Sequence, residues 1–334
     1  MEKVNSFIFN FETMVTKEYK LTIIKIIKFT IVFLIVDFVL GIISNQLFYS
    51  QETGKYARST HAVEKTNAEI IVFGSSHAHR HYVPKIFEKE LGKTCYNAGA
   101  EGQQLLYHTA LQEMILKRVK PKLIVLNIDE NFLYTSKQAY DRLSDLHPYY
   151  AGHSKELSAI LGLKSRFIDF KLFFKSYQMN STIVHALRYY VSPQLDYHGY
   201  RPLYGKINPN KVNSHTKEEV KEYVELIDDN FVEVVEKFID NARNNGCELV
   251  FVTSPTFNKV NHDKNKSFIR IKEIIATKKV PFIDFFNSSD FNGKSELFHD
   301  FSHLNNDGAE LFTKQLTKKI MDMNLINYNK KMIE

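Results

Sequence analysis

Two serines and a histidine follow a short apolar run near residue 70. The stretch "IIVFGSSHAH" starts with Ile70–Phe73, which is typical of a buried strand, and passes through Gly74 to Ser75, Ser76 and His77. These hydroxyl groups stand where a helix should begin. They either cap that helix, or one of them is presented to a ligand and acts as a nucleophile once a base takes its proton.

A candidate base and its orienting acid stand near the other end of the chain, in "HDFSHLNNDG". Asp300 and His303 are three positions apart on a predicted loop. A carboxylate at that spacing can lie beside one imidazole nitrogen while the other nitrogen faces the serine, which is the arrangement used in acyl transfer. Taken alone, the two residues could equally be an incidental surface pair.

Two further polar blocks follow apolar runs, "NAGAEG" at Asn97–Gly102 and "DEN" at Asp129–Asn131. The backbone N–H of Ser76, a glycine N–H of the first block and an asparagine amide of the second could together hold a developing oxyanion. Losing one such donor typically costs a factor of about 100 to 1,000 in rate. Each block on its own could also be an ordinary turn or loop.

The elements that must position these residues alternate between strand and helix. Strands are predicted at 69–74, 93–97, 122–129, 247–252 and 280–285, and helices at 85–91, 106–119, 215–246, 266–279 and 307–319. This alternation predicts an α/β fold, a five-stranded parallel sheet covered by helices on both faces as a three-layer α/β/α domain. Ligands of such sheets bind at the carboxyl ends of the strands, where all four polar blocks fall.

The predicted helix over 215–246 is the longest of the domain. Its expected apolar stripe consists of Val220, Tyr223, Val224, Ile227, Phe231, Val234, Val235 and Phe238. Residues 135–215 break the alternation and are rich in aromatic and basic residues. We interpret them as a partly helical insertion or cap near the mouth of the sheet; a packing subdomain is the alternative, and the aromatic residues suit either a sugar-binding platform or a core.

The segment "FTIVFLIVDFVLGIISNQLF" is almost wholly apolar and long enough to cross a bilayer. An uncleaved anchor at 29–49 is favoured over a cleaved signal peptide or a buried core helix. The lysines that precede it place 1–28 in the cytoplasm and the rest outside, as a single-pass protein of the cell membrane. Asp37 interrupts the span and either pairs with another helix or is a tolerated charge. Residues 50–68 are predicted to be a linker.

The composition fits a globular domain with a sizeable core. The chain has 334 residues, 44% of them hydrophobic, and a net charge of +6 from scattered lysines. That charge indicates no nucleic-acid site. Cys95 and Cys247 are predicted to be buried free thiols, and their spacing is not that of zinc ligands. The sequence indicates no metal, nucleotide or other cofactor.

Together, the G-x-S turn, the glycine block, the asparagine block and the closing D-x-x-H resemble the SGNH (GDSL-like) hydrolase superfamily, over residues 70 to about 319. The resemblance implies a flavodoxin-like hydrolase domain over 69–325 with the insertion unmatched. It implies Ser76 as nucleophile, His303 as base and Asp300 as the acid that orients it. Ser75 stands where the common G-D-S form has aspartate.

The same resemblance implies an oxyanion hole formed by Ser76, Gly99 and Asn131, with Gly102 and Asn127 as substitutes. "DEN" replaces the usual G-x-N-D, which makes Asn131 the least secure member. His77 and Gly102 are candidates for contact with substrate. His79, Arg80 and His81 are expected to be solvated positions in the first turns of the helix, as His77 itself is if it does not bind substrate.

The form "GSSH", the "NAG" block and the apolar N-terminal segment are similar to membrane-tethered members that act in alginate acetylation and teichoic acid D-alanylation. That likeness implies a serine O-acyltransferase that acylates, in the first place acetylates, a cell-surface polysaccharide or related polymer. It also implies a multi-span membrane O-acyltransferase as partner. An esterase with the same triad, or a non-catalytic glycan-binding scaffold, remains an alternative.

Overall fold

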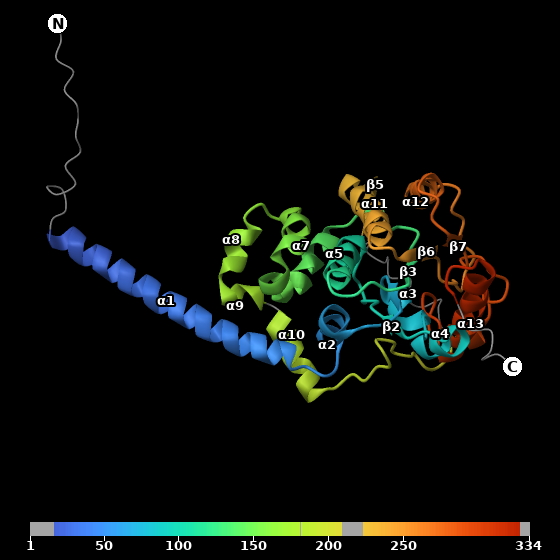
Figure 1. Cartoon of the computed structure of the whole chain (residues 1–334), viewed down its shortest axis with the longest axis horizontal. Coiled ribbons are helices and arrows are strands. Elements are labelled where there is room, and N and C mark those ends of the chain that lie inside the picture. Colours follow the sequence, from blue (N-terminus) through green and yellow to red (C-terminus); the bar gives the residue numbers. More distant parts are fainter. Residues whose placement is uncertain (1–16, 181, 209–222, 328–334) are drawn as a thin grey trace, which may run out of the picture.

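The computed structural model describes residues 17–180, 182–208 and 223–327. A five-stranded parallel sheet forms its centre (Figure 1), and the strand order is β2-β1-β3-β6-β7. The strands are β1 Ile70–Phe73, β2 Cys95–Asn97, β3 Leu123–Asn127, β6 Glu248–Val252 and β7 Phe282–Ile283. The expected α/β fold with a parallel sheet is confirmed, and the strand order is the flavodoxin-like one.

Neighbouring residues of each strand point to opposite faces of the sheet, and helices cover both faces. Ile70 and Val72 pack with one group of helices, whereas Ile71 and Phe73 pack with the other. The first group is α3 Ser76–His81, α4 Pro84–Leu91 and α13 Asn306–Asp322. The second group is α5 Leu105–Leu116, α11 Asp229–Asn244 and α12 Lys266–Thr277. The three layers hold the carboxyl ends of the strands at one edge.

The long helix expected over 215–246 is shorter in the structure. Residues 224–227 form strand β5 (Val224–Ile227), which pairs antiparallel with β4 (Tyr134–Thr135). Asp228 then caps α11, since its side chain accepts a hydrogen bond from the Asn230 N–H at 3.1 Å. The stripe from Phe231 onward is buried as expected, but Val224 is exposed. Val220 lies outside the described residues.

The segment expected to be a linker at 50–68 is folded. It contains α2 (Lys55–Thr60) and a π-helical turn, η1 (His61–Lys65). Tyr56 and Val63 are buried in the core that also holds α5. The polar composition misled the prediction because polar side chains of this segment, including Arg58, Ser59 and Thr60, are buried as well.

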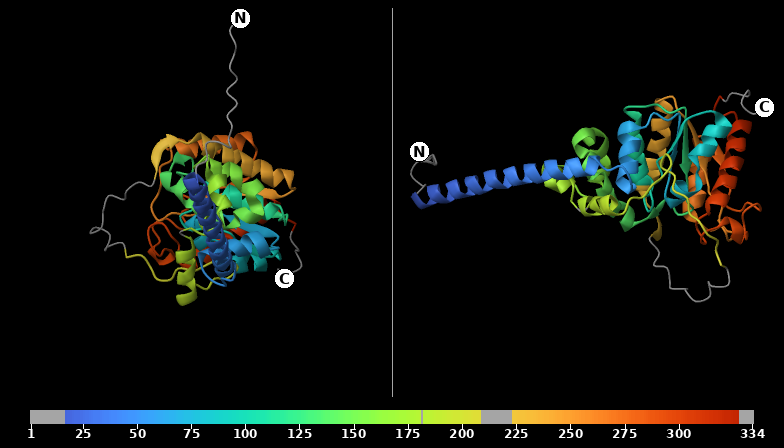
Figure 2. Two further views of the ribbon diagram at one scale, coloured as in Figure 1. Left: turned by 90° about the vertical axis from the view of Figure 1, so that its left-hand side faces the viewer. Right: turned by 90° about the horizontal axis from the view of Figure 1, so that it is seen from below.

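The helices of the insertion pack beside α5 and α1 (Figures 1 and 2), whereas residues 203–207 contact the segment 298–306 that carries His303. The insertion is partly helical, as expected. Its elements are α6 Lys137–Asp141, η2 Arg142–Tyr149, α7 Tyr150–Gly162, α8 Ile168–Phe173, α9 Lys175–Gln178 and α10 Thr182–Val191. Leu146, Tyr149 and Leu161 bury their side chains against the main core, which accounts for much of the aromatic and apolar content. Residues 209–215 lie outside the described part.

Helix α1 (Lys17–Tyr49) projects from the domain on the side of the insertion (Figure 2). Among the described residues it is the one helix long and apolar enough to cross a membrane, and most of its apolar side chains are exposed. A buried core helix is therefore excluded. Cys95 and Cys247 are buried and are not bonded to each other.

Candidate active site

A sharp turn after β1 presents Ser76. Gly74 has a φ of 138°, and a Cβ there would lie 2.9 Å from the Cβ atoms of both Ala78 and Asn127. Only glycine fits this conformation and this space. The turn lets the chain leave the strand and start α3 at once, with Ser76 as its first residue.

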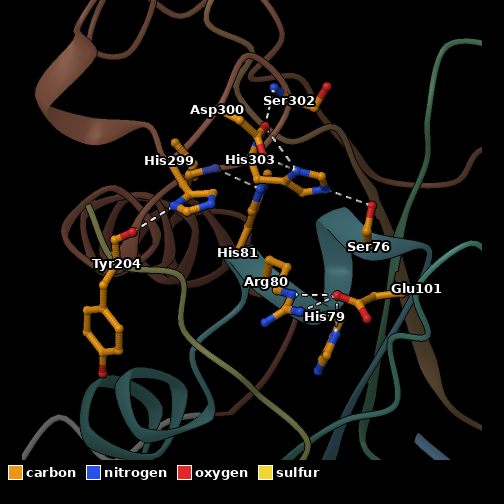
Figure 3. A network of polar contacts seen from close by, with 11 residues as sticks. Ser76, His79, Arg80, His81, Glu101, Tyr204, His299, Asp300, Ser302 and His303 are labelled. Carbon is orange, nitrogen blue, oxygen red and sulfur yellow. Dashed lines mark hydrogen bonds and ion pairs between the residues drawn. The ribbon is translucent and has the colours of Figure 1, made fainter. Parts of the chain in front are cut away.

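The structure brings Ser76, His303 and Asp300 into one hydrogen-bonded chain (Figure 3). The Nε2 atom of His303 lies 2.9 Å from the Ser76 Oγ. Its Nδ1 lies 3.0 Å from each carboxylate oxygen of Asp300. This is the contact order that allows an imidazole to take a serine proton while a carboxylate fixes its tautomer and orientation.

Hydrogen bonds within the loop and to two neighbouring segments hold the loop that carries His303. The N–H of His299 donates to the His303 carbonyl at 2.8 Å, and the His299 Nδ1 donates to the Tyr204 carbonyl at 2.7 Å. The Leu304 N–H donates to the Nε2 of His81 at 3.0 Å. Burial lowers the pKa of His81 well below its usual range, so this histidine stays neutral and able to accept that bond. The base is thereby held in place beside Ser76.

Asp300 is a strongly ionised carboxylate. Although partial burial alone would raise its pKa, hydrogen bonds from the His303 ring and from the N–H groups of Ser302 and His303 lower the pKa to about 2. The N–H bonds are both 2.8 Å long. Asp300 is therefore negatively charged at any physiological pH and can stabilise an imidazolium at His303.

His77 and Asp129 form a second pair next to Ser76. The His77 Nδ1 lies 2.6 Å from one Asp129 oxygen, and the Ser75 hydroxyl donates to the other oxygen at 2.6 Å. Although burial alone would lower the pKa of His77 and raise that of Asp129, their mutual attraction raises the former and lowers the latter. Ser75 therefore does not cap α3 with its side chain, and it supports this ion pair.

Sequence reasoning missed Asp129, although its place directly after β3 could have pointed to it, because carboxyl ends of parallel strands collect functional groups. His77, expected to touch substrate, does line the cleft beside Ser76. Its Nδ1, however, is hydrogen-bonded to Asp129. This bond holds the ring in place, so only its other edge is left for a contact with substrate.

The structure separates the candidates for the oxyanion hole into two groups. The Gly99 N–H donates to the Asn97 side chain at 2.9 Å, and a Cβ on Gly99 would lie 2.5 Å from the His79 nitrogen. Gly99 thus allows close packing of the loop on α3 and does not face the cleft. Asn127 is fully buried, and its side-chain Oδ1 accepts hydrogen bonds from the hydroxyl groups of Tyr82 and Ser254.

Gly102 and Asn131 do line the cleft with Ser76. The Asn131 side-chain oxygen accepts a hydrogen bond from Asn265 at 3.1 Å, which fixes the orientation of its amide group. The Gly102 carbonyl accepts a hydrogen bond from Arg142, so this turn is also held. Of the two candidate glycines, Gly102 and not Gly99 therefore borders the cleft, while the oxyanion role itself stays a prediction.

The side chains after His77 are not solvated, contrary to expectation. His79 and His81 are fully buried and Arg80 is nearly so. Arg80 makes an ion pair with Glu101 (Figure 3), which joins α3 to the loop after β2. Helix α3 is covered by α13 on one side and by this loop on the other, so polar residues in it need buried partners.

A cleft of about 600 Å³ opens above Ser76. Ser76, His77 and His303 lie on it together with Asp129 and Asn131. Its other walls carry polar residues, including Gln103, Gln104 and Glu130, and the aromatic rings of Phe132, Tyr223, Phe286 and Phe301. Such a mixed surface suits a substrate that is both polar and ring-shaped.

No family model matches the chain, and no curated protein is significantly similar to it in sequence. Among solved structures, it is similar to a candidate acylhydrolase from Bacteroides fragilis, with 14% identity and a TM-score of 0.38 over 79% of this chain and 95% of that one. A second is a candidate platelet activating factor from Streptococcus pneumonia, with 14% identity and a TM-score of 0.37 over 86% and 99%. Scores this low carry no weight for function, which must be supported by the cleft itself.

Proposed function

We propose that this chain is a membrane-anchored, extracytoplasmic serine acyltransferase of the SGNH type that O-acylates a cell-surface polysaccharide or related polymer. One observation carries the proposal. An ionised Asp300, His303 and Ser76 are joined by hydrogen bonds of about 3 Å, and the serine opens onto a cleft. This arrangement makes a serine hydroxyl nucleophilic at neutral pH.

In the proposed first half-reaction, the Ser76 Oγ attacks the carbonyl carbon of an ester while the His303 Nε2 takes its proton. The tetrahedral intermediate collapses, the ester C–O bond breaks, and the leaving oxygen receives that proton from His303. In the second half-reaction, His303 removes a proton from a sugar hydroxyl, which attacks the acyl-enzyme. The new ester leaves, and His303 returns the proton to Ser76. Asp300 stabilises the imidazolium in both halves.

The developing oxyanion needs hydrogen-bond donors. The N–H of Ser76 is in the first turn of α3, where backbone N–H groups have no partner within the helix. The Asn131 amide, oriented by Asn265, and the backbone of Gly102 border the same cleft. We assign the oxyanion hole to these three groups.

Two features favour a glycan acceptor. The cleft combines polar side chains with aromatic faces, and both suit a sugar ring. The apolar stretch of α1 follows the lysines at the start of the helix and is followed by the domain. This order supports an anchor with the catalytic part outside the cell, where surface polymers are found. A multi-span membrane acyltransferase is the proposed source of the acyl groups. Water as acceptor would make the same triad an esterase.

A serine-directed fluorophosphonate tests the nucleophile. We expect it to label Ser76 in the folded protein, and Ser76→Ala to abolish labelling. Ser302→Ala is the matched control, because the exposed Ser302 supplies only its backbone N–H to Asp300. Absence of labelling in the folded wild type would refute the enzyme and favour a scaffold.

An activated acetyl ester separates transfer from hydrolysis. With a glycan present, a transferase should release the alcohol faster and acetylate the glycan. Acetate release that is unaffected by glycan would favour the esterase. In cells, full glycan acylation by Ser76→Ala would contradict both enzymatic roles.

A further inference from the structure

Apolar side chains are exposed on the insertion, next to α1. Phe167, Phe170 and Phe173 lie on or just before α8 and are 59%, 69% and 68% exposed. Val184, Leu187 and Val191 continue this surface on α10, and they are exposed as well. A water-soluble domain rarely exposes so many large apolar groups together. We call residues 163–180 and 182–195 the membrane seat.

The membrane seat is joined to α1 through Asp37. This carboxylate, only 7% exposed, accepts hydrogen bonds from the Lys175 N–H at 2.9 Å, the Ser176 N–H at 3.0 Å and the Ser176 hydroxyl. The first backbone N–H groups of α9 therefore have an acceptor, and the buried charge of Asp37 has hydrogen-bond donors. The partner helix expected for Asp37 is thus found within the same chain.

Packing on both sides of Asp37 brings the two helices close together. A Cβ on Gly41 would lie 2.2 Å from the Lys175 Cβ, so glycine is needed for this approach. On the other side, the rings of Phe33 and Phe174 meet edge to face at 5.7 Å. Farther along, the Tyr190 hydroxyl donates to the Leu47 carbonyl. The seat therefore contacts α1 along its length from Phe33 to Leu47.

That contact fixes the depth of the seat if α1 spans a membrane. In the apolar stretch from Phe29 to Phe48, Asp37 comes eight residues after the start and eleven before the end. At 1.5 Å per residue these separations are about 12 Å and 17 Å, within a hydrocarbon layer about 30 Å thick. Asp37 therefore lies near the middle of this layer, and α9, whose first residues contact it, lies at the same depth.

The charges of the seat fit a lipid surface. Arg166, Lys171, Lys175 and Arg188 are exposed, and Asp169 is the acidic residue among them. The Arg166 guanidinium lies over the Phe167 ring, 4.9 Å from its centroid. Long basic side chains can extend to headgroups while aromatic residues beside them enter the acyl region.

We propose that the membrane seat is immersed in the bilayer that α1 crosses, with its phenylalanines among the acyl chains and its basic residues extending toward anionic headgroups. This inference rests on the anchor in the proposed function and extends it. The bilayer, and not a partner protein, covers the exposed apolar face. The catalytic domain is then held at a fixed height and orientation, and does not swing on a tether.

The chain contains no tryptophan, so single tryptophans can report on lipid contact. Full-length F170W, F38W and I269W are reconstituted in phosphatidylcholine–phosphatidylglycerol vesicles with brominated acyl chains. Phe38 is an exposed residue of α1, and Ile269 is an exposed residue of α12, far from α1 (Figure 1). We expect emission from F170W to be quenched to an extent comparable with F38W, and I269W to keep its emission. F173W repeats the test should F170W fold poorly.

The outcomes separate the seat from the anchor. Quenching of F38W but not of F170W overturns the seat and leaves the anchor. Absence of quenching in both overturns the anchor and the seat with it. Protection of F170W from the aqueous quencher acrylamide without quenching by brominated lipid also overturns the proposal, because a second copy of the chain would then cover this face. None of these outcomes bears on Ser76, whose labelling is measured separately.

Discussion

The Nε2 atom of His303 lies 2.9 Å from the Oγ atom of Ser76, although 227 positions separate the two residues. The parallel sheet accounts for this contact. Ser76 follows β1, and His303 precedes α13, which packs on the same face of the sheet as α3. Both loops therefore reach the carboxyl edge of the sheet, where Asp300 completes the chain of hydrogen bonds.

Asp300→Asn should lower kcat for an acetyl ester by a factor of about 10³ to 10⁴, because an amide cannot stabilise the imidazolium and favours the wrong tautomer of His303. Esterase kinetics and fluorophosphonate labelling rates measure the loss. Asp307→Asn, at an exposed carboxylate on α13, is the matched control and should retain activity. A variant Asp300→Asn with wild-type kcat would remove Asp300 from the mechanism.

Asp300 should also affect stability in a defined pH range. Its pKa falls from 3.8 in the unfolded chain to about 2 in the folded one, so the ionised form stabilises the fold above about pH 4, and this contribution is lost as the pH falls toward 2. The difference in Tm between wild type and Asp300→Asn should be constant from pH 5 to 7 and should shrink below pH 4. A difference that stays the same at pH 2.5 would contradict this prediction.

The ion pair of His77 and Asp129 should have the opposite pH dependence. Its contribution to stability is lost at high pH, whereas that of Asp300 is lost at low pH. Because Asp129 raises the pKa of His77, the protonated ring stabilises the fold below about pH 6.5, and this contribution disappears as the pH rises through the higher folded pKa. Asp129→Asn should destabilise the fold by about 2 kcal/mol at pH 6. Denaturant titrations at pH 6 and pH 9 measure the change, which should be smaller at pH 9.

A useful control for that measurement is Asp307→Asn, because Asp307 is an exposed carboxylate on α13 and does not contact His77. It should leave the pH dependence of stability unchanged. Equal loss of stability in Asp129→Asn at both pH values would mean that the contact is not an ion pair.

The two asparagines at the end of β3 should respond differently to alanine. Asn131→Ala should lower kcat by a factor of about 100 to 1,000 with Tm nearly unchanged, because its amide faces the cleft. Asn127→Ala should lower Tm, because it leaves the buried hydroxyls of Tyr82 and Ser254 without their acceptor. Thermal unfolding and esterase assays on both variants distinguish the roles. The reverse pattern would move the oxyanion role from Asn131 to its substitute, Asn127.

The sequence was a good guide wherever hydrophobic periodicity was strong. β-branched runs predicted the strands of the sheet, and the order of the polar blocks correctly predicted their meeting at one edge. It failed where tertiary contacts outweigh local pattern. Residues 224–227 have helical spacing but pair with Tyr134–Thr135.

The histidines of α3 show the same limit. Their polar character predicted solvent exposure, and the burial of His79 and His81 follows from the packing of α13 and the loop after β2, which no local pattern shows. Gly99 and Gly102 lie in the same loop and differ in backbone conformation and in contacts, so choosing between them required the structure. The binding of Asp37 to α9 involves 139 positions of separation and could not be foreseen from the apolar segment alone.

Asp37 offers a final prediction about the link between α1 and the seat. Asp37→Ala should leave the N–H groups of Lys175 and Ser176 without an acceptor, at a cost of about 1 to 3 kcal/mol, and should loosen α9 from α1. Hydrogen exchange of residues 168–178 in the reconstituted full-length protein should then become faster. Asp37→Asn keeps one acceptor oxygen and should have a smaller effect.

Val36→Ala, at an exposed neighbour on α1, is the control for changes in the helix itself and should leave that exchange unchanged. If Asp37 were only a tolerated charge, Asp37→Ala would make α1 more apolar without altering exchange in α9. The rate of exchange at residues 168–178 therefore decides between a structural link and a tolerated charge, because only a link transmits the loss of the carboxylate to a segment more than 130 positions away.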